Sequence, residues 1–153
     1  MSSLELSVPP VAVALLIAGG MGGVSELTSP TGLPDFLRLT LCLILVASGA
    51  WISLIAVGAF RQANTTVNPT KPDSTSALVC TGVYRYTRNP MYLGFLLILC
   101  GLGIFLASPP AFIGPAVFVL YMNRFQIVPE ERALAAHFGD EFIRYQQQVR
   151  RWC

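Results

Sequence analysis

The sequence predicts an all-α, polytopic membrane protein with about four transmembrane helices and a C-terminal amphipathic helical segment in the cytosol. Two observations carry this prediction. Of the 153 residues, 54% are hydrophobic and only 12% are charged, whereas a soluble domain carries about a quarter charged residues. The charges are also clustered, because no Asp, Glu, Lys or Arg occurs in the ranges 6–25, 39–60 and 89–123. Since crossing a bilayer takes about 20 apolar residues, each of these ranges is long enough for a span.

A single membrane domain over 1–153 accounts for the whole chain. We place its spans at 8–24, 36–60, 91–108 and 111–128, its cytosolic loop at 61–89 and its C-terminal helical segment at 129–152. Only Pro109 and Pro110 separate the last two spans, which predicts a tight antiparallel hairpin because proline does not continue a helix interior. A secretory signal peptide needs a positive n-region. The only early charge is Glu5, so we expect the first segment to be retained.

Small residues predict where the spans approach one another. Gly19 and Gly23 are four residues apart in the first span, and Gly94, Gly101 and Gly103 lie in the third. Glycine lets membrane helices come close together, so we expect these positions to serve packing.

Basic residues predict the orientation, because retained cytosolic loops are enriched in Lys and Arg. With four spans, one side of the membrane receives every Lys and Arg of the chain except Arg38. We therefore expect a multi-pass protein with both termini in the cytosol, in a bacterial inner membrane or the endoplasmic reticulum. The net charge of +2 does not suggest nucleic-acid binding. The four cysteines include no Cys-x-x-Cys pair, so neither a disulfide framework nor a metal site is expected.

The C-terminal segment carries one apolar stripe. Its members recur at helical spacing and are Leu134, Phe138, Phe142, Tyr145 and Val149. Gly139 is expected to kink or divide this helix. Two placements stay open: the stripe packs against the membrane domain, or it lies in the interface while Arg144, Arg150 and Arg151 meet anionic headgroups.

Three groups of polar residues fall on the predicted cytosolic side: 82–88, 89–94, and Arg124 with Glu130 and Glu131. Two of them are also typical helix starts. Asn89 before Pro90 suits an N-cap followed by proline at the first helical position. Pro129 followed by two acids suits another start, because carboxylates complement the positive end of a helix dipole.

Five short motifs occur in order along the second half of the chain. They are Gly-Val-Tyr at 82–84, Arg-Asn-Pro-Met-Tyr-Leu-Gly at 88–94, Pro-Glu-Glu-Arg-Ala-Leu at 129–134, Phe-Gly-Asp-Glu-Phe at 138–142 and Tyr-x-x-x-Val-Arg-Arg-Trp at 145–152. Together they resemble the isoprenylcysteine carboxyl methyltransferase family and its bacterial relatives. The resemblance extends from Leu78 to Trp152, and the first two spans carry no comparable signature.

The resemblance implies a membrane methyltransferase that binds S-adenosylmethionine near the cytosol and receives a lipid-like acceptor from the bilayer, of the prenylcysteine carboxylate type. It places cofactor contacts at Ala77, Leu78, Val79, Tyr84, Asn89, Pro90, Met91, Tyr92 and Glu130. The charges of the cofactor add Arg88 for its carboxylate, and Glu131 as an alternative to Glu130 for its ammonium. Tyr84 and Tyr92 can offer hydroxyls or ring faces to its cationic end.

Two positions differ from the family pattern or match it loosely. Asn89 stands where many members have His, which removes a titratable group and keeps a hydrogen-bonding one. Arg124 lies near the family's substrate-contacting arginine, so it either positions the substrate or only anchors the helix end.

Several alternatives stay open. The same architecture suits a phospholipid amine or a small hydrophobic thiol or amine; an amine must first lose a proton, which Glu131 or His137 would receive. An NADPH-dependent membrane reductase has a similar Arg-x-Pro-x-Tyr-x-Gly region, but Met91 stands where that motif usually has Asn. A small transporter or assembly subunit is less favoured, because the third span has no ionisable residue near the bilayer midplane. The oligomeric state is left open.

Overall fold

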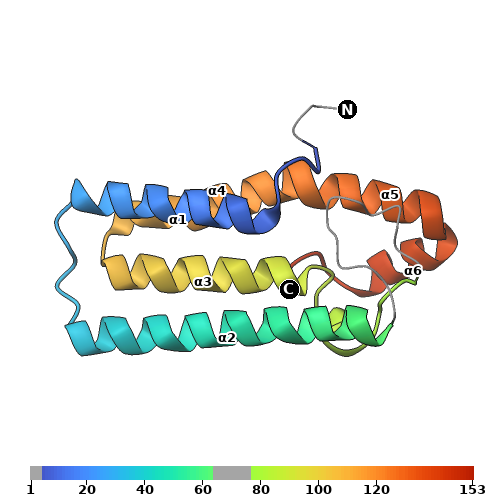
Figure 1. The fold of residues 1–153 in the computed structure, drawn as a ribbon, viewed down its shortest axis with the longest axis horizontal. Coiled ribbons are helices and arrows are strands. Elements are labelled where there is room, and N and C mark those ends of the chain that lie inside the picture. Colours follow the sequence, from blue (N-terminus) through green and yellow to red (C-terminus); the bar gives the residue numbers. More distant parts are fainter. Residues whose placement is uncertain (1–4, 64–76) are drawn as a thin grey trace.

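The computed structural model describes residues 5–63 and 77–153, and all regular structure within these ranges is helical (Figure 1). The elements are α1 (Pro10–Glu26), α2 (Asp35–Gln62), η2 (Gly82–Arg85), α3 (Pro90–Leu106), η3 (Pro109–Phe112), α4 (Ile113–Tyr121), η4 (Met122–Ile127), α5 (Val128–Phe138) and α6 (Asp140–Gln148). The prediction of an all-α protein is confirmed for this part of the chain. Helices α1, α2 and α3 begin and end within two residues of the first three predicted spans. Most of the predicted loop 61–89 lies outside the described residues.

The predicted helix start at Pro129 is wrong, because one helix runs without a break from Pro109 to Phe138. The π-helical turn η4 (Met122–Ile127) ends two residues before Pro129. A proline inside a helix removes the donor that would reach the carbonyl four residues back, which here belongs to Phe125. That carbonyl accepts a hydrogen bond from the Leu6 backbone N–H at 3.0 Å. Pro129 is therefore accommodated inside the helix, and Glu130 and Glu131 do not begin a new one.

Helix α3 lies between α2 on one side and α1 with α4 on the other (Figure 1). Helices α2 and α3 touch through two glycines: a Cβ added at Gly94 would collide with the side chain of Ser53 and the backbone of Gly49. At Gly101 a Cβ would lie 3.2 Å from the carbonyl oxygen of Cys42. The expected packing role of Gly94 and Gly101 is therefore confirmed.

The other predicted glycine contact is wrong. Nothing among the described residues lies within 4 Å of a Cβ added at Gly19 or Gly23. These two residues face outward from α1, because α1 meets α3 and α4 through other positions that include Val13 and Met21.

Much of the apolar surface of the bundle faces outward. In α2 the side chains of Leu43, Trp51 and Leu54 are exposed, and only 11% of its most apolar stretch is buried. The core helix of a soluble protein would be mostly buried instead. Among the described residues, α2 and the helix Pro109–Phe138 are long and apolar enough to cross a membrane, whereas α1 and α3 are shorter apolar helices of 17 residues. These are the features of a helical membrane protein.

Helices α5 and α6 form a hairpin at one end of the bundle (Figure 1). Gly139 joins them with φ 53°, in the region that favours glycine, and so divides the helix as expected. The apolar stripe is buried between the two helices and against the segment Leu78 to Cys80. Of the two placements left open, packing inside the protein is therefore the one that the structure adopts.

Candidate functional site

The start of α3 meets the junction of η4 and α5 in a polar cluster. The Tyr92 hydroxyl donates to Glu130 Oε1 at 2.5 Å, and Gln126 Nε2 donates to the same oxygen at 2.5 Å. Tyr92 and Gln126 are buried. Gln126 and Glu130 share one side of their helix because they are four residues apart. The fold thus brings together the polar groups that the sequence holds 38 residues apart.

The neighbouring carboxylate is occupied by two arginines. Arg151 donates from Nε to Glu131 Oε1 at 3.1 Å and from Nη2 to Oε2 at 2.6 Å. Arg88 Nη2 lies 3.2 Å from Glu131 Oε1. The hydrogen bond between Arg151 and Glu131 raises the pKa of Arg151. The Arg151 guanidinium thus forms a bidentate pair inside the protein, as in the packed placement of the two left open, whereas Arg144 and Arg150 are exposed.

Arg88 has spare donors. Its Nε and Nη1 are buried and have no hydrogen-bond partner in the described structure. Leaving a buried donor unpaired costs about 1–3 kcal/mol, and more for a charged group, so such atoms are rare in native proteins. Arg88 is therefore equipped to bind an anion that would complete its hydrogen bonds.

The C-terminal tail is tied to the start of α3. Asn89 Nδ2 donates to the carbonyl of Arg151 at 2.9 Å, and the Arg88 backbone N–H donates to the carbonyl of Arg150 at 3.0 Å. Thr87 Oγ1 donates to the same Arg151 carbonyl at 3.3 Å. Asn89 is the N-cap residue of α3 and Pro90 occupies its first turn, as expected, but the Asn89 side chain makes no capping hydrogen bond. The amide of Asn89 is used to hold the tail instead.

Tyr84 lies beside the cluster on the short helix η2. Its ring meets Phe60 of α2 edge-on, with 5.4 Å between the ring centroids, and its carbonyl accepts a hydrogen bond from the Tyr145 hydroxyl at 2.7 Å. Burial, with the nearby Tyr145 and Glu130, raises the pKa of Tyr84. Burial likewise raises the pKa of Tyr145. Both phenols therefore stay neutral at physiological pH and act as hydrogen-bonding and packing groups.

Of the remaining predicted contacts, Val79 and Met91 pack beside Tyr84. Val79 is buried with Tyr84 and Ala56, and Met91 packs against the same core. Leu78 packs against α6 instead. Ala77 is the first residue after the gap in the described chain, and it is partly buried.

Arg124 and His137 are not brought to the cluster. Arg124 is exposed and pairs with Glu5 at 3.1 Å. Two residues further on, Gln126 is buried against Glu130, and residues two apart do not share a helix face. His137 is exposed at the end of α5, where its ring contacts Phe138 with 4.7 Å between centroids.

Three contributors to the site were not predicted. Gln126 is a buried amide four residues before Glu130, and that spacing within an apolar helix is a signal that could have identified it. Thr87 and the tail pair of Trp152 Nε1 with Asn123 Oδ1, at 3.1 Å, have no such local signal. Their partners lie far away in the chain.

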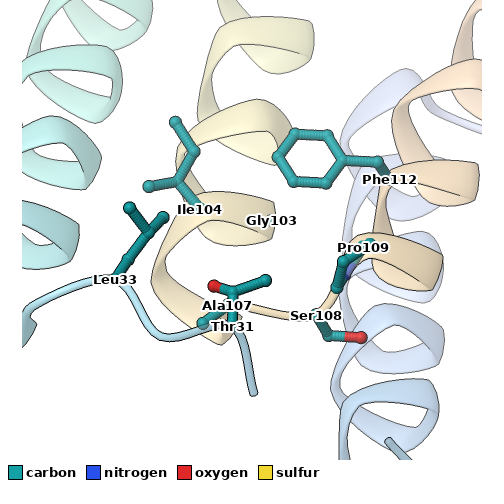
Figure 2. Close-up of a pocket in the computed structure, with 8 residues that line it drawn as sticks. All are labelled: Thr31, Leu33, Gly103, Ile104, Ala107, Ser108, Pro109 and Phe112. Carbon is teal, nitrogen blue, oxygen red and sulfur yellow. The ribbon is translucent and has the colours of Figure 1, made fainter. Parts of the chain in front are cut away.

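A cavity of about 250 Å³ lies at the opposite end of the bundle (Figure 2). Its lining is mostly apolar and consists of Thr31, Leu33, Gly103, Ile104, Ala107, Ser108, Pro109 and Phe112. These residues surround the end of α3, whereas Asn89 and Tyr92 lie at its start. The cavity is therefore separate from the polar cluster.

Comparisons with known proteins match the chain to methyltransferases. Residues 37–141 match a family described as phospholipid methyltransferase. The chain is 31% identical over 109 residues to a protein-S-isoprenylcysteine O-methyltransferase of Saccharomyces cerevisiae, covering 69% of this chain and 44% of that protein. It is 33% identical over 110 residues to a probable protein-S-isoprenylcysteine O-methyltransferase of Oryza sativa subsp. indica, covering 70% of this chain and 56% of that protein.

A shorter relative matches more strongly. An uncharacterized protein of Haemophilus influenzae is 48% identical over 62 residues, which is 40% of this chain and 98% of that protein. The chain thus spans about half the length of the yeast and rice relatives that it matches. No solved structure matches the chain.

Proposed function

The chain belongs to the phospholipid methyltransferase family, and on this premise we propose that it is a membrane enzyme that transfers a methyl group from S-adenosylmethionine to a lipid-like acceptor. The acceptor proposed first is a prenylcysteine-type carboxylate, in line with the names of the yeast and rice relatives. A phospholipid amine is the second candidate, because the family description names phospholipids.

The observation that carries the proposal is the pair of unpartnered donors on Arg88. S-adenosylmethionine has a carboxylate, an ammonium and a sulfonium. Arg88 Nε and Nη1 suit the carboxylate, because guanidinium and carboxylate form strong charge-assisted hydrogen bonds. Glu130 suits the ammonium: both of its hydrogen bonds in the described structure fall on Oε1, which leaves Oε2 to accept another. The residues present therefore fit this cofactor.

Glu131 has a different part in this proposal. Because Arg88 and Arg151 already bind it, Glu131 positions the Arg88 guanidinium and does not bind the ammonium. In this proposal the ligand is enclosed by Tyr84, Asn89, Tyr92 and residues 77–79. Pro90 and Met91, at the start of α3, complete the enclosure. Arg124 lies outside this proposed site, and its part in positioning the acceptor stays a prediction.

The chemistry that these residues support is alignment. S-adenosylmethionine supplies an electrophilic methyl group when bound. A carboxylate acceptor is ionised at neutral pH and needs no general base, so the protein has only to hold it in line with that methyl in a dry site. Such positioning supplies about 7–11 kcal/mol. Glu131 is bound by two arginines and His137 is exposed on α5, so neither is placed as a base for an amine, which favours the carboxylate acceptor.

We propose further that α1, α2, α3 and the α4–η4 helix all cross the membrane, with the cluster and both termini at the cytosolic face. Helices of 17 residues are about 25 Å long, near the lower limit for a span. Arg38, the one basic residue on the opposite side, pairs with Asp35 and with the carbonyl of Phe105 at that end of the bundle.

Cofactor binding tests the proposal directly. Detergent-solubilised protein should bind S-adenosylmethionine and its demethylated product in a calorimeter. Arg88→Gln should weaken binding by about 10- to 100-fold, since a hydrogen bond to a charged group contributes about 1.5–3 kcal/mol. Arg85→Gln is the matched control, because Arg85 is exposed on the neighbouring helix η2. Failure of the wild-type protein to bind either molecule would refute the cofactor assignment.

The acceptor is identified by transfer of label. Membranes that contain the protein are incubated with radiolabelled S-adenosylmethionine and, separately, with a prenylcysteine, phosphatidylethanolamine or a small hydrophobic thiol. We expect label in the prenylcysteine extract. Label only in phosphatidylethanolamine would replace the first acceptor with the second and leave the cofactor assignment intact.

A further inference from the structure

The N-terminal segment binds the outer face of the long helix, away from the polar cluster. Arg124 donates to Glu5 Oε1 and Arg132 donates to Glu5 Oε2, each at 3.1 Å. The Glu5 side chain is only 5% exposed, whereas the side chains of Arg124 and Arg132 are 59% and 58% exposed. Although burial opposes it, the two arginines lower the pKa of Glu5. Arg124 and Arg132 thus form an anion-binding site, and in this structure the carboxylate of Glu5 occupies it.

This anion-binding site lies at the end of an exposed apolar stripe on α4. Ile113, Val117 and Leu120 are all exposed on α4, and their spacing of four and three residues places them on one helix face. Arg124 follows Leu120 by four residues and continues that face. The last apolar residues of this helix before Glu130 are Ile127, Val128 and Pro129. Arg124 and Arg132 therefore stand on either side of the point where the proposed span reaches the membrane surface. A phospholipid has the complementary shape, with acyl chains followed by a phosphate.

We propose that Arg124, Arg132 and the stripe Ile113, Val117 and Leu120 bind one anionic phospholipid, whose phosphate replaces the carboxylate of Glu5. Arginine binds phosphate and carboxylate through the same paired donors. Glu5 therefore competes with the lipid phosphate for the anion-binding site. The proposal rests on the membrane location alone and is independent of methyl transfer.

Lipid binding by the full chain tests the inference. Detergent-solubilised protein is titrated with phosphatidylglycerol or phosphatidylcholine, and bound lipid is counted by native mass spectrometry. A basic residue near an anionic surface changes binding by about fivefold. We therefore expect Glu5→Gln, which releases both arginines, to raise phosphatidylglycerol binding about fivefold or more. Arg124→Gln with Arg132→Gln should lower it by about 25-fold.

The controls separate this site from general surface charge. Arg61→Gln removes another exposed arginine, at the end of α2, and should leave phosphatidylglycerol binding unchanged. Inorganic phosphate at equal concentration should not compete, because it lacks the acyl chains that the stripe would contact. Equal binding in the wild type and Glu5→Gln, an equal loss in Arg61→Gln, or full competition by inorganic phosphate would each overturn the proposal.

Discussion

Glu130 and Glu131 show how adjacent residues of one type acquire different roles. Glu131 accepts hydrogen bonds or an ion pair on both oxygens, from Arg88 and Arg151. Glu130 receives two neutral donors on one oxygen and keeps the other. Successive residues of a helix point in different directions, so Glu130 faces α3 while Glu131 faces the tail. The ability of each carboxylate to bind a ligand follows from what the fold has already bonded to it.

Replacing each carboxylate by its amide separates these roles. Glu130→Gln should weaken S-adenosylmethionine binding by about 10- to 100-fold, because a charge-assisted bond to the ligand is lost. Glu131→Gln should lower the free energy of unfolding by about 1.5–3 kcal/mol, because two arginines lose their carboxylate. Calorimetric titration and thermal unfolding in detergent measure the two effects. Similar losses of affinity and stability in both variants would contradict the assignment.

At the scale of elements, α2 and α3 are joined by close backbone contact. Gly49 and Gly94 face one another, and no larger side chain fits between them. The predicted glycine pair Gly19 and Gly23 has no such neighbour within 5–63 and 77–153. The glycines of the two helices look equivalent in the sequence, because a small residue shows that a helix can approach a partner without showing that one is present.

Alanine at these positions should distinguish the two helices. Gly94→Ala should destabilise the protein by about 1–3 kcal/mol, since the added methyl group forces α2 and α3 apart. Gly19→Ala meets open space and removes a poor helix former, so it should be neutral or stabilise by up to about 1 kcal/mol. Thermal unfolding in one detergent compares them. A loss at Gly19 as large as that at Gly94 would show that α1 has a packing partner outside the described chain.

At the scale of the whole molecule, polar and apolar groups are separated along the bundle. The candidate site, η2 and the α5–α6 hairpin lie at one end, and the apolar cavity and Arg38 lie at the other (Figures 1 and 2). Helix α2 contacts mainly α3, and the opposite face of α2 is exposed. This division suits a protein whose middle is covered by lipid and whose polar end is in water.

The proposed orientation can be tested at the native Cys153, which is exposed at the C-terminus. In a variant with the other three cysteines changed to serine, a membrane-impermeant maleimide should label Cys153 only when the cytosolic side is accessible. The basic residues on that side provide the physical reason. Labelling from the outer face of intact cells would show an odd number of spans or the reverse orientation.

The sequence alone determined the all-helical fold, the extents of three helices to within two residues, and the groups that converge at the start of α3. These depend on local hydrophobic length and on motif spacing, which each segment carries within itself. Only the tertiary structure decided that the last long helix continues through Pro129, that Asn89 holds the tail, and that Arg124 pairs with Glu5. The partners in these contacts are 62 and 119 residues apart for Asn89 and Arg124, and Pro129 depends on the amide of Leu6. No local pattern specifies pairings over such distances, because they arise from how the packed helices place their ends.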